Sequence, residues 1–412
     1  MDLRYPPEVE GFRGEVRHWL EENLPAGWFE PDFTLEGEDK ERLNKEWTSK
    51  LYEGGWICAS WPKSYGGRGL STLENVVVAE EFARANAPIR ADFFGDTLVG
   101  PTLLQWGTEE QKKAFLPQIL RGEISWCRGF SEPDAGSDLA SLTTKAVLDG
   151  DEWVITGQKI WTTQAQYADY IFLLARTDPD APKHQGISYL LIPMKQPGVE
   201  VRPIIQIDGS GEFNEVFFTE ARCPKENVVG GINNGWKVAM TTLGFERGTS
   251  AATSFRRFEK EFDEIVEHAR RRGLLADPLV RQRLARQWTT IQIMRINGYR
   301  TLTDVVRGGR DPSVKALGAT NKMFWSESHR DTMELALDVL GMDAQILTGS
   351  AEGYVPGVGV RRGRDDYQVT PLQASFFFSR SETIWGGTAE IQRNIVGERV
   401  LGLPKEPKPT LA

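Results

Sequence analysis

Cysteine is scarce in this 412-residue chain, which contains only Cys58, Cys127 and Cys223. The three lie far apart, their number is odd, and none forms a CxxC pair. Disulfide-stapled domains and zinc sites carry cysteines in regular sets. The sequence therefore predicts neither a disulfide framework nor a metal cluster, and it favours a reducing compartment, the cytoplasm.

Histidine is almost as rare, with His18, His184, His268 and His329 scattered along the chain. Three of them stand in charged segments with helical spacing and one stands in a loop, so we expect all four at the surface. General acid–base chemistry often uses histidine. Here we expect any such role to fall to a carboxylate.

Long apolar runs and excess positive charge are absent as well. No stretch of about 18 or more apolar residues occurs, which argues against a membrane-spanning helix. The segment MDLRYPPEVEGFRGEV is polar and lacks the hydrophobic region of a signal peptide. A net charge of -9 and a pI near 5.3 argue against a nucleic-acid partner and against a polybasic membrane patch.

Several familiar catalytic motifs are also missing. The sequence contains no GxGxxG, no Walker A, no HExxH and no GxSxG. The segment GVGVRRG, which begins at Gly357, has the wrong spacing and no strand before it. A Rossmann-type dinucleotide site is therefore not supported.

The pattern that is present runs from helices to strands and back to helices. Apolar residues from Val9 to Leu24 share one helix face, and Thr108 with Gln111 forms a capping box. Asp149-Gly150 joins two β-rich runs and predicts a hairpin. The segments YIFLLART, GISYLLIPM, VEVRPIIQI and NEVFFTE predict further strands. We expect an α+β protein with a helical domain over 1–122, an antiparallel β domain over 123–235 and a helical domain over 236–412.

The stretch ETIWGGTAEIQRNIVGERV, from Glu382 to Val400, combines bare backbone with a helix start. Gly386 and Gly387 precede Thr388, a good N-cap, and Glu390 lies in the first turn, where a carboxylate suits the helix dipole. One interpretation is a loop that simply packs tightly before a helix. The other is a flat or anionic ligand held against the bare backbone.

Three motifs in order decide between these interpretations. GFSEPDAGSDLASLTTKA runs from Gly129 to Ala146, GQKIWTTQAQYAD runs from Gly157 to Asp169, and GGTAEIQRN follows near the end. Together they resemble the acyl-CoA dehydrogenase family, over about residue 5 to residue 404. The resemblance implies a helical domain, a β domain and a C-terminal four-helix bundle that bind FAD and an acyl-CoA. Within the family, the chain looks similar to the actinobacterial steroid side-chain type and to the large subunit of the pimeloyl-CoA type.

The resemblance also implies roles for single residues. Backbone amides near Phe130 and Ser131 would bind the flavin ring, Trp161 would pack on it, and Thr163 would bond near N5. Thr388 and Glu390 would contact FAD phosphate and ribose. The implied cofactor-binding residues are Arg128, Phe130, Ser131, Ser137, Trp161, Thr163, Arg272, Thr388 and Glu390, and the implied substrate-binding residues are Ser137, Arg247, Gly386 and Gly387.

One departure from the family pattern concerns the catalytic base. Many members carry a glutamate where this chain has Gly386, and a second branch places it on an earlier helix. TTLGFERGTS supplies Glu246 in that context, followed by Arg247. The resemblance therefore implies Glu246 as the base.

Other departures concern the adenine end of FAD. Arg272 is implied to reach the FAD of a neighbouring subunit, although the run ARRRG leaves the choice among Arg270, Arg271 and Arg272 open. Asp338, Val339 and Met342 replace a glycine-rich segment that starts with glutamine, and Asp277-Pro278 replaces a Phe-Gln pair.

The implied reaction is FAD-dependent α,β-dehydrogenation of an acyl-CoA to the trans-2-enoyl-CoA, with Glu246 removing the α proton and flavin N5 accepting the β hydride. Gly244, Gly248 and Gly386 remove bulk near the base, which favours a branched, cyclic or wide acyl group. The expected partners are an electron-transfer flavoprotein and either three more copies of the chain or a sister chain in an α2β2 heterotetramer. A flavin oxidase or monooxygenase, and a flavin-binding subunit of a heteromeric dehydrogenase, are the alternatives.

Overall fold

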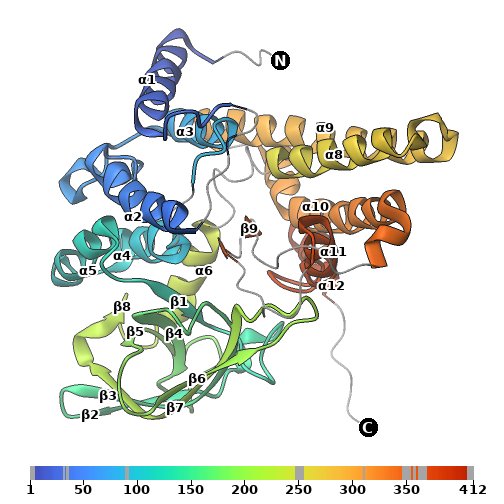
Figure 1. The fold of residues 1–412 in the computed structure, drawn as a ribbon. Helices are drawn as coiled ribbons and strands as arrows, with labels where there is room; N and C mark the ends of the chain where they lie inside the picture. The colour runs from blue at the N-terminus through green and yellow to red at the C-terminus, as the bar shows by residue number, and fades with distance from the viewer. Residues whose placement is uncertain are drawn as a thin grey trace, which may run out of the picture.

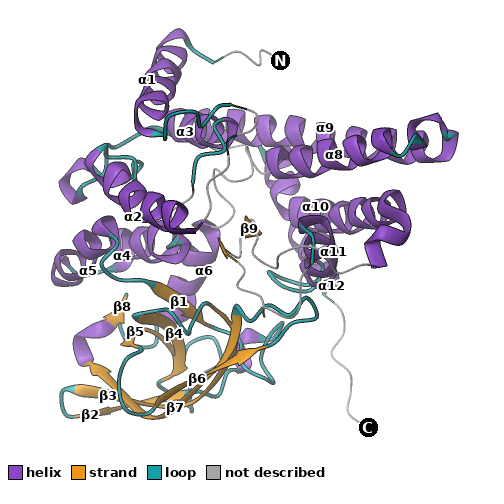
Figure 2. Cartoon of the chain, in the orientation of Figure 1, coloured by secondary structure: helices purple, strands orange, loops and turns teal. Residues whose placement is uncertain are grey.

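The computed structural model describes residues 5–30, 33, 37–88, 92–245, 255–309, 311–345, 354–355, 359–360 and 369–405. Helices from the first part of the chain lie beside a β domain, and the later helices form a second helical body (Figures 1 and 2). The expected α+β class and the order helices, strands, helices are confirmed.

The N-terminal helices begin where the sequence supplies caps. Ser71 and Glu74 form a capping box at α3, and Thr108 and Gln111 form the expected one at α5. Gly122 then ends α5 in the left-handed conformation that glycine adopts at no cost. The helices are α1 Pro7–Asn23, α2 Gly37–Glu53, α3 Thr72–Arg84, α4 Gly100–Trp106 and α5 Glu109–Arg121, with a π-helical turn, η2, at Gly95–Val99.

The β domain is built on one sheet in the order β6-β7-β3-β2-β4-β5-β8, with β1 paired to β4. Most neighbours are antiparallel, whereas β1 runs parallel to β4. The expected hairpin is confirmed, since Gly150 joins β2 to β3 with a φ of 63°. The strands are β1 Trp126–Gly129, β2 Lys145–Asp149, β3 Glu152–Thr163, β4 Tyr170–Arg176, β5 Ile187–Pro193, β6 Val199–Ile204, β7 Phe213–Pro224 and β8 Val228–Val229.

The C-terminal body consists of long helices that pack on one another. Asp277 caps α9 by accepting a hydrogen bond from the Leu279 amide, and Pro278 takes the first helical position, where proline is well tolerated. The Asp-Pro departure from the family pattern is therefore a helix start. α6 Gly235–Phe245 precedes this body and packs beside α4 and β5. The elements that follow it are α8 Phe255–Arg271, α9 Pro278–Val306, α10 Pro312–Leu340, α11 Pro371–Glu382 and α12 Ala389–Ile395, a π-helical turn at Val396–Val400, and the short strands β9 Tyr354–Val355 and β10 Gly359–Val360.

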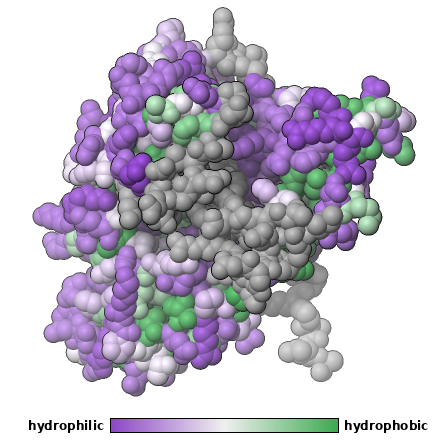
Figure 3. All heavy atoms as spheres, in the orientation of Figure 1, coloured by the Kyte–Doolittle hydropathy of each residue, from purple (hydrophilic) through white to green (hydrophobic). Residues whose placement is uncertain are grey.

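Separate hydrophobic cores hold these bodies together. One core joins the N-terminal helices to one part of the sheet, a second lies within the β domain, and a third lies between α8, α9, α10 and α11. The face in Figure 3 is mostly hydrophilic over the N-terminal helices and shows hydrophobic patches over the β domain and the long C-terminal helices. Among the helices of the described ranges, none is long and apolar enough to cross a membrane.

Candidate functional site

Buried hydrogen bonds and an ion pair from residues of β3 hold the loop that follows β1. Lys159, fully buried on β3, donates to the Phe130 carbonyl at 3.0 Å and to Glu132 at 2.8 Å. The Ile160 amide donates to the Ser131 carbonyl at 3.0 Å. The carbonyls of Phe130 and Ser131 are thus turned into the protein, and the backbone of the SEPDAGSD loop is held in one place.

The buried Glu132–Lys159 pair is supported by further hydrogen bonds. Glu132 accepts from the amides of Thr143 and Thr144 at 2.6 and 2.9 Å. Burial opposes ionisation of Glu132, but the Lys159 charge and these donors outweigh it and lower its pKa to about 2. Burial also lowers the pKa of Lys159, to about 8, because the ammonium has lost its water.

Trp161 is aimed outward by an irregularity in β3. The register between β3 and β7 shifts between Lys159 and Thr162, as in a β-bulge, which re-aims side chains. Trp161 has a φ of 59° and is 58% exposed, while Thr162 next to it is fully buried. Thr163 then lies opposite Phe213 on β7. An exposed indole beside a fixed loop is a surface on which a flat ring can pack.

The turn that leads into α12 has the expected cap. The Thr388 hydroxyl accepts from the Ile391 amide at 3.1 Å, which confirms the predicted N-cap. Gly386 and Gly387 have φ values of 66° and 91°, where side chains are rarely found. Among the described residues, a Cβ at Gly386 would meet only Lys322 Cε, at 3.8 Å, so these residues leave space beside the glycine.

Aromatic rings bring Trp161 and this turn to the same region. Trp161 lies edge-on to Phe213, with ring centroids 6.4 Å apart. Phe213 packs on the buried Phe378 of α11, and Phe378 lies 6.0 Å from Trp385 in the turn. Residues more than 200 positions apart in the sequence, Trp161 and Trp385, therefore border one site between the β domain and the C-terminal helices.

A hollow opens beside the start of α12. Its volume is about 530 Å³, and both ends of the turn contribute to its wall. The residues that line it are Glu327, Arg330, Thr383, Ile384, Thr388, Ala389, Glu390 and Arg393. Thr388 and Glu390, to which the family resemblance gives a role in cofactor binding, thus border a space large enough for part of a ligand.

Other residues predicted from the sequence lie outside this group. Arg128 packs over the rings of Phe94 and Phe130, with distances of 5.9 and 5.7 Å to their centroids. Ser137 is exposed on its loop. Glu246 and Arg247 lie outside the described residues and follow directly after α6.

The three arginines at the end of α8 have partners within the chain. Arg272 directly follows α8 and pairs at 2.6 Å with Asp343, in the 3-10 turn that follows α10. Arg270 and Arg271 both pair with Glu267. The role predicted for Arg272, to reach the FAD of a neighbour, stays a prediction.

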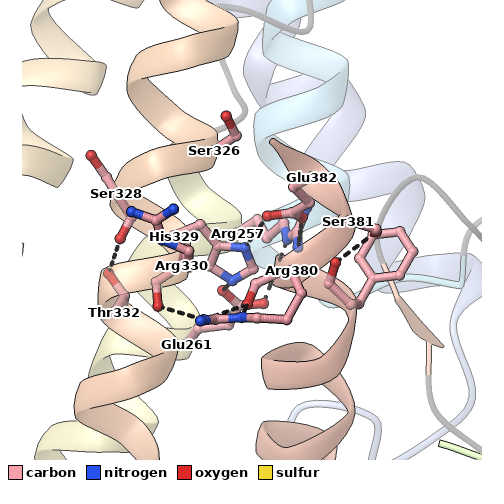
Figure 4. Close-up of polar contacts among 12 residues, drawn as sticks. Arg257, Glu261, Ser326, Ser328, His329, Arg330, Thr332, Arg380, Ser381 and Glu382 are labelled. Atoms are coloured by element: carbon pink, nitrogen blue, oxygen red, sulfur yellow. Dashed lines mark hydrogen bonds and ion pairs between the residues drawn. The ribbon is translucent and has the colours of Figure 1, made fainter. Parts of the chain in front are cut away.

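The expectation that every histidine lies at the surface is wrong for His329. Its ring is buried in the C-terminal bundle, between Glu261 of α8 and Glu382 of α11 (Figure 4). Arg257 of α8 completes the group, which we call the His329 cluster: Arg257, Glu261, His329 and Glu382. A histidine in a charged helix looks exposed in the sequence, and only the packing of three helices shows that its neighbours neutralise it.

Buried charges in the His329 cluster stabilise one another. Burial lowers the pKa of His329, but the carboxylates of Glu261 and Glu382 outweigh this and raise it to about 9. Burial likewise opposes ionisation of Glu261, and the charges of His329 and Arg257 lower its pKa to about 2. The pKa of Glu382 is lowered for the same reason. The cluster therefore holds two cations and two anions at neutral pH.

Comparisons with known proteins agree with this arrangement. Residues 6–123, 127–221 and 233–401 match the N-terminal, middle and C-terminal domain models of acyl-CoA dehydrogenases. The chain belongs to the acyl-CoA dehydrogenase family. It is therefore an oxidoreductase of a flavin-dependent family, as the three sequence motifs predicted.

Individual relatives match nearly the whole length of the chain. Acyl-CoA dehydrogenase IpdE1 of Mycobacterium tuberculosis is 45% identical, over 97% of this chain and 99% of its own. A solved structure titled Tcur3481-Tcur3483 steroid ACAD is 35% identical, with a TM-score of 0.78, and covers 98% of this chain and 100% of its own. The ChsE4-ChsE5 complex from Mycobacterium tuberculosis is 30% identical, with a TM-score of 0.77 and the same coverage.

Proposed function

We propose that this acyl-CoA dehydrogenase binds FAD and converts an acyl-CoA thioester to the trans-2-enoyl-CoA. The observation that carries the proposal is the meeting of Trp161 with the Gly386–Gly387 turn through Phe213 and Phe378. The exposed indole, the fixed Ser131 backbone and the hollow beside Thr388 fit a flat, phosphate-bearing cofactor. When bound, FAD would accept the hydride from the β carbon.

Glu246 is the proposed base that removes the α proton. Gly386 has no side chain to do so, and Glu327, which lines the hollow, is paired with Arg393. Two further glutamates near the turn are also poorly suited. Glu382 is fully buried and held by Arg257 and His329, and the Glu390 side chain is 80% exposed. Glu246 follows directly after α6, whose Thr242 is bonded to Thr102 in the core. The unsuitable positions of Glu382 and Glu390 therefore support Glu246 as the base, at the residue that follows α6.

The backbone of the turn is proposed to stabilise the developing enolate oxygen. An α C–H is weakly acidic, so its removal needs a hydrogen-bond donor at the thioester oxygen. The Gly386 N–H is the donor that we assign to this role, and the left-handed φ values of the turn set its direction. Loss of such a donor typically costs about 2.7–4 kcal/mol of barrier.

The proposed substrate is the CoA thioester of a wide, cyclic acyl group of the steroid kind. Support comes from the solved relative named a steroid ACAD and from the open space at two glycines. Counting the described residues alone, a Cβ at Gly244 would meet nothing within 4 Å, and one at Gly386 would meet Lys322. Gly248, the third glycine of this argument, lies outside the described residues.

The proposed assembly is a tetramer in which this chain pairs with copies of itself or with a sister chain, and the proposed electron acceptor is an electron-transfer flavoprotein. The ChsE4-ChsE5 complex, a structural relative named for two chains, favours a sister chain. Light scattering of the protein, alone and co-expressed with a neighbouring dehydrogenase chain, distinguishes the two assemblies. A monomer that keeps its flavin would contradict both.

Turnover by the purified protein tests the reaction. We expect a yellow protein that releases FAD on denaturation and whose visible absorbance bleaches anaerobically with a steroid-type acyl-CoA. Straight-chain and branched acyl-CoA thioesters, tested alongside, define the substrate. Bleaching by none of them, with any sister chain present, would contradict the proposal, while rapid peroxide release in air would favour the oxidase alternative.

A further inference from the structure

The His329 cluster is connected to the Gly386–Gly387 turn through Glu382, which lies four residues before Gly386. Glu382 is the last residue of α11, and residues 383–387 carry the chain from there to the α12 cap. Its carboxylate is fully buried and is held by Arg257 at 3.0 Å and by His329 at 2.5 Å. Because the chain leaves α11 at this residue, whatever holds the Glu382 carboxylate also fixes the point where the turn begins.

Both imidazole nitrogens of His329 lie close to a carboxylate oxygen. His329 Nδ1 lies 2.5 Å from Glu382 Oε2, and Nε2 lies 2.9 Å from Glu261 Oε2. A neutral imidazole offers one donor, and an ionised carboxylate is only an acceptor. The Nδ1 contact is a hydrogen bond, whereas the Nε2 contact is an ion pair without hydrogen-bond alignment. A protonated imidazole places a positive charge beside both carboxylates, and with Arg257 it balances their two negative charges.

One face of α10 supports the turn at several points. Lys322 donates from Nζ to the Gly387 carbonyl at 2.8 Å, and Trp325 lies 5.8 Å from Trp385, between ring centroids. His329 is seven residues after Lys322, which is about two helical turns, so both project from the same face. α10 therefore holds the beginning of the turn through Glu382 and its end through Gly387.

We propose that His329, as an imidazolium between Glu261 and Glu382, is a positioning residue that fixes the Gly386–Gly387 turn for the thioester. The role of the turn rests on the proposed function, whereas the effect of His329 on the turn does not. Without this cation, two buried carboxylates face Arg257 alone. A buried excess charge is strongly unfavourable, so water would enter or Glu382 would move, and the turn would move with it.

Groups from each packed helix define how the cluster responds to pH. α8 contributes Arg257 and Glu261 together with the ring of Phe258, whose centroid is 5.1 Å from that of His329, and α11 contributes Glu382. On the α9 side, Gln287 accepts from Thr332 of α10. The charged groups that face His329 are thus two carboxylates and one guanidinium, and deprotonation at alkaline pH removes the cation that balances them.

A charge-balance cycle tests the inference. His329→Gln leaves a net charge of -1 in the cluster, and Glu261→Gln with His329→Gln restores zero. Hydrogen exchange of the backbone amides in residues 381–392 is followed on protein without cofactor or substrate. We expect His329→Gln to speed exchange there at least about tenfold and the double variant to reverse much of it. His268→Gln, on α8 outside the cluster, is the matched control and should exchange like the unmodified protein.

Kinetics supply the second readout. A misplacement of about 1 Å can cost about 100-fold in rate, so kcat should fall about ten- to a hundredfold in His329→Gln while KM changes less. Unchanged exchange in the turn, or a double variant no better than His329→Gln, would overturn the inference. If no variant and no unmodified protein turns over any acyl-CoA, the proposed function fails, and the exchange result still decides the role of His329.

Glu261→Gln alone covers the case in which His329→Gln does not fold. Removing this carboxylate removes one of the two charges that raise the His329 pKa, to about 9 in the unmodified protein. The pH at which the turn loosens, after correction for intrinsic exchange, should then move to a lower value. The same pH in Glu261→Gln and in the unmodified protein would contradict the inference.

Discussion

Two groups of buried charges support the proposed site, and they differ in how they are built. The Glu132–Lys159 pair fastens the loop after β1 within one sheet domain, and its members are 27 residues apart. The His329 cluster fastens the turn after α11 and joins three helices, with Arg257 and Glu382 separated by 125 residues. The first group belongs to two motifs that mark the family, whereas all four members of the second group lie outside the three motifs. The β-domain side of the proposed site is thus supported by residues close together in the sequence, and the helical side by residues far apart in the sequence.

Glu246→Gln is expected to have the largest effect of the variants considered, and this effect is on the rate of flavin reduction by substrate. A positioned general base contributes about 10²–10⁴-fold, so we expect anaerobic flavin bleaching by substrate to slow by that factor. The amide keeps the shape of the side chain but cannot take a proton, and flavin content should stay unchanged. Stopped-flow absorbance measures the rate.

The matched control is Glu226→Gln, an exposed glutamate in a short 3-10 turn after β7, which should react at the normal rate. Near-normal bleaching in Glu246→Gln would show that another group is the base and that the site is organised differently from the proposal.

Lys159→Met tests the pair within the sheet. It leaves Glu132 buried without its cation, and such a loss typically costs about 3–5 kcal/mol of unfolding free energy. Adding Glu132→Gln should recover part of this, since the charge is removed. Denaturant unfolding monitored by tryptophan fluorescence provides the measurement. Lys195→Met, which breaks an exposed pair with Asp169, should cost no more than about 1 kcal/mol; equal effects of the two lysine variants would contradict the comparison.

A rise in pH should change the contributions of His329 and Lys159 to the free energy of unfolding in opposite directions. The pKa of His329 is raised from 6.5 to about 9 in the folded state, so its stabilisation is complete below 6.5 and is lost as the pH rises through 9. That loss is on the order of 3 kcal/mol at most. The pKa of Lys159 is lowered from 10.5 to about 8, so its contribution becomes less unfavourable between those values.

Measurements of the unfolding free energy between pH 6.5 and 9 can separate the two contributions. The fall in unfolding free energy with rising pH that His329 causes should be smaller in His329→Gln. The pH profiles of His268→Gln and the unmodified protein should coincide. A decline of the same size in His329→Gln would place its origin outside the cluster.

Thr388→Ala is expected to have the smallest effect on stability. Loss of an N-cap costs about 1 kcal/mol, and Thr108→Ala at the start of α5 gives the reference for a cap alone. If Thr388 also binds FAD, as the family resemblance implies, only Thr388→Ala should weaken flavin binding. Isothermal titration of apoprotein with FAD separates the two roles, and equal flavin affinity in both variants would leave Thr388 as a cap.

The sequence predicted elements with local signals well. The Thr108 capping box, the Asp149-Gly150 hairpin and the Thr388 cap each depend on residues within a few positions, and all three are confirmed. The family and its α+β fold were predicted because three motifs occur in a fixed order. The site residues and the domain boundaries stay predictions.

The His329 cluster and the aromatic contact between Phe213 and Phe378 could not be predicted from the sequence in the same way. Neither has a local signal, because each depends on how separate helices and strands pack. Arg272 shows a related limit. Its pairing with Asp343 places two oppositely charged side chains 71 residues apart side by side, and no spacing rule connects them.

The contact between Phe213 and Phe378 has a consequence for how the protein holds itself together. Within the part of the chain that the structure describes, it is one contact at which the β domain meets the C-terminal helices beside the proposed cofactor. A ligand that binds only when the bodies are docked stabilises the docked arrangement in proportion to the logarithm of its concentration. Bound flavin would then stabilise the contact between the β domain and the C-terminal helices, and its release would be the first step of unfolding.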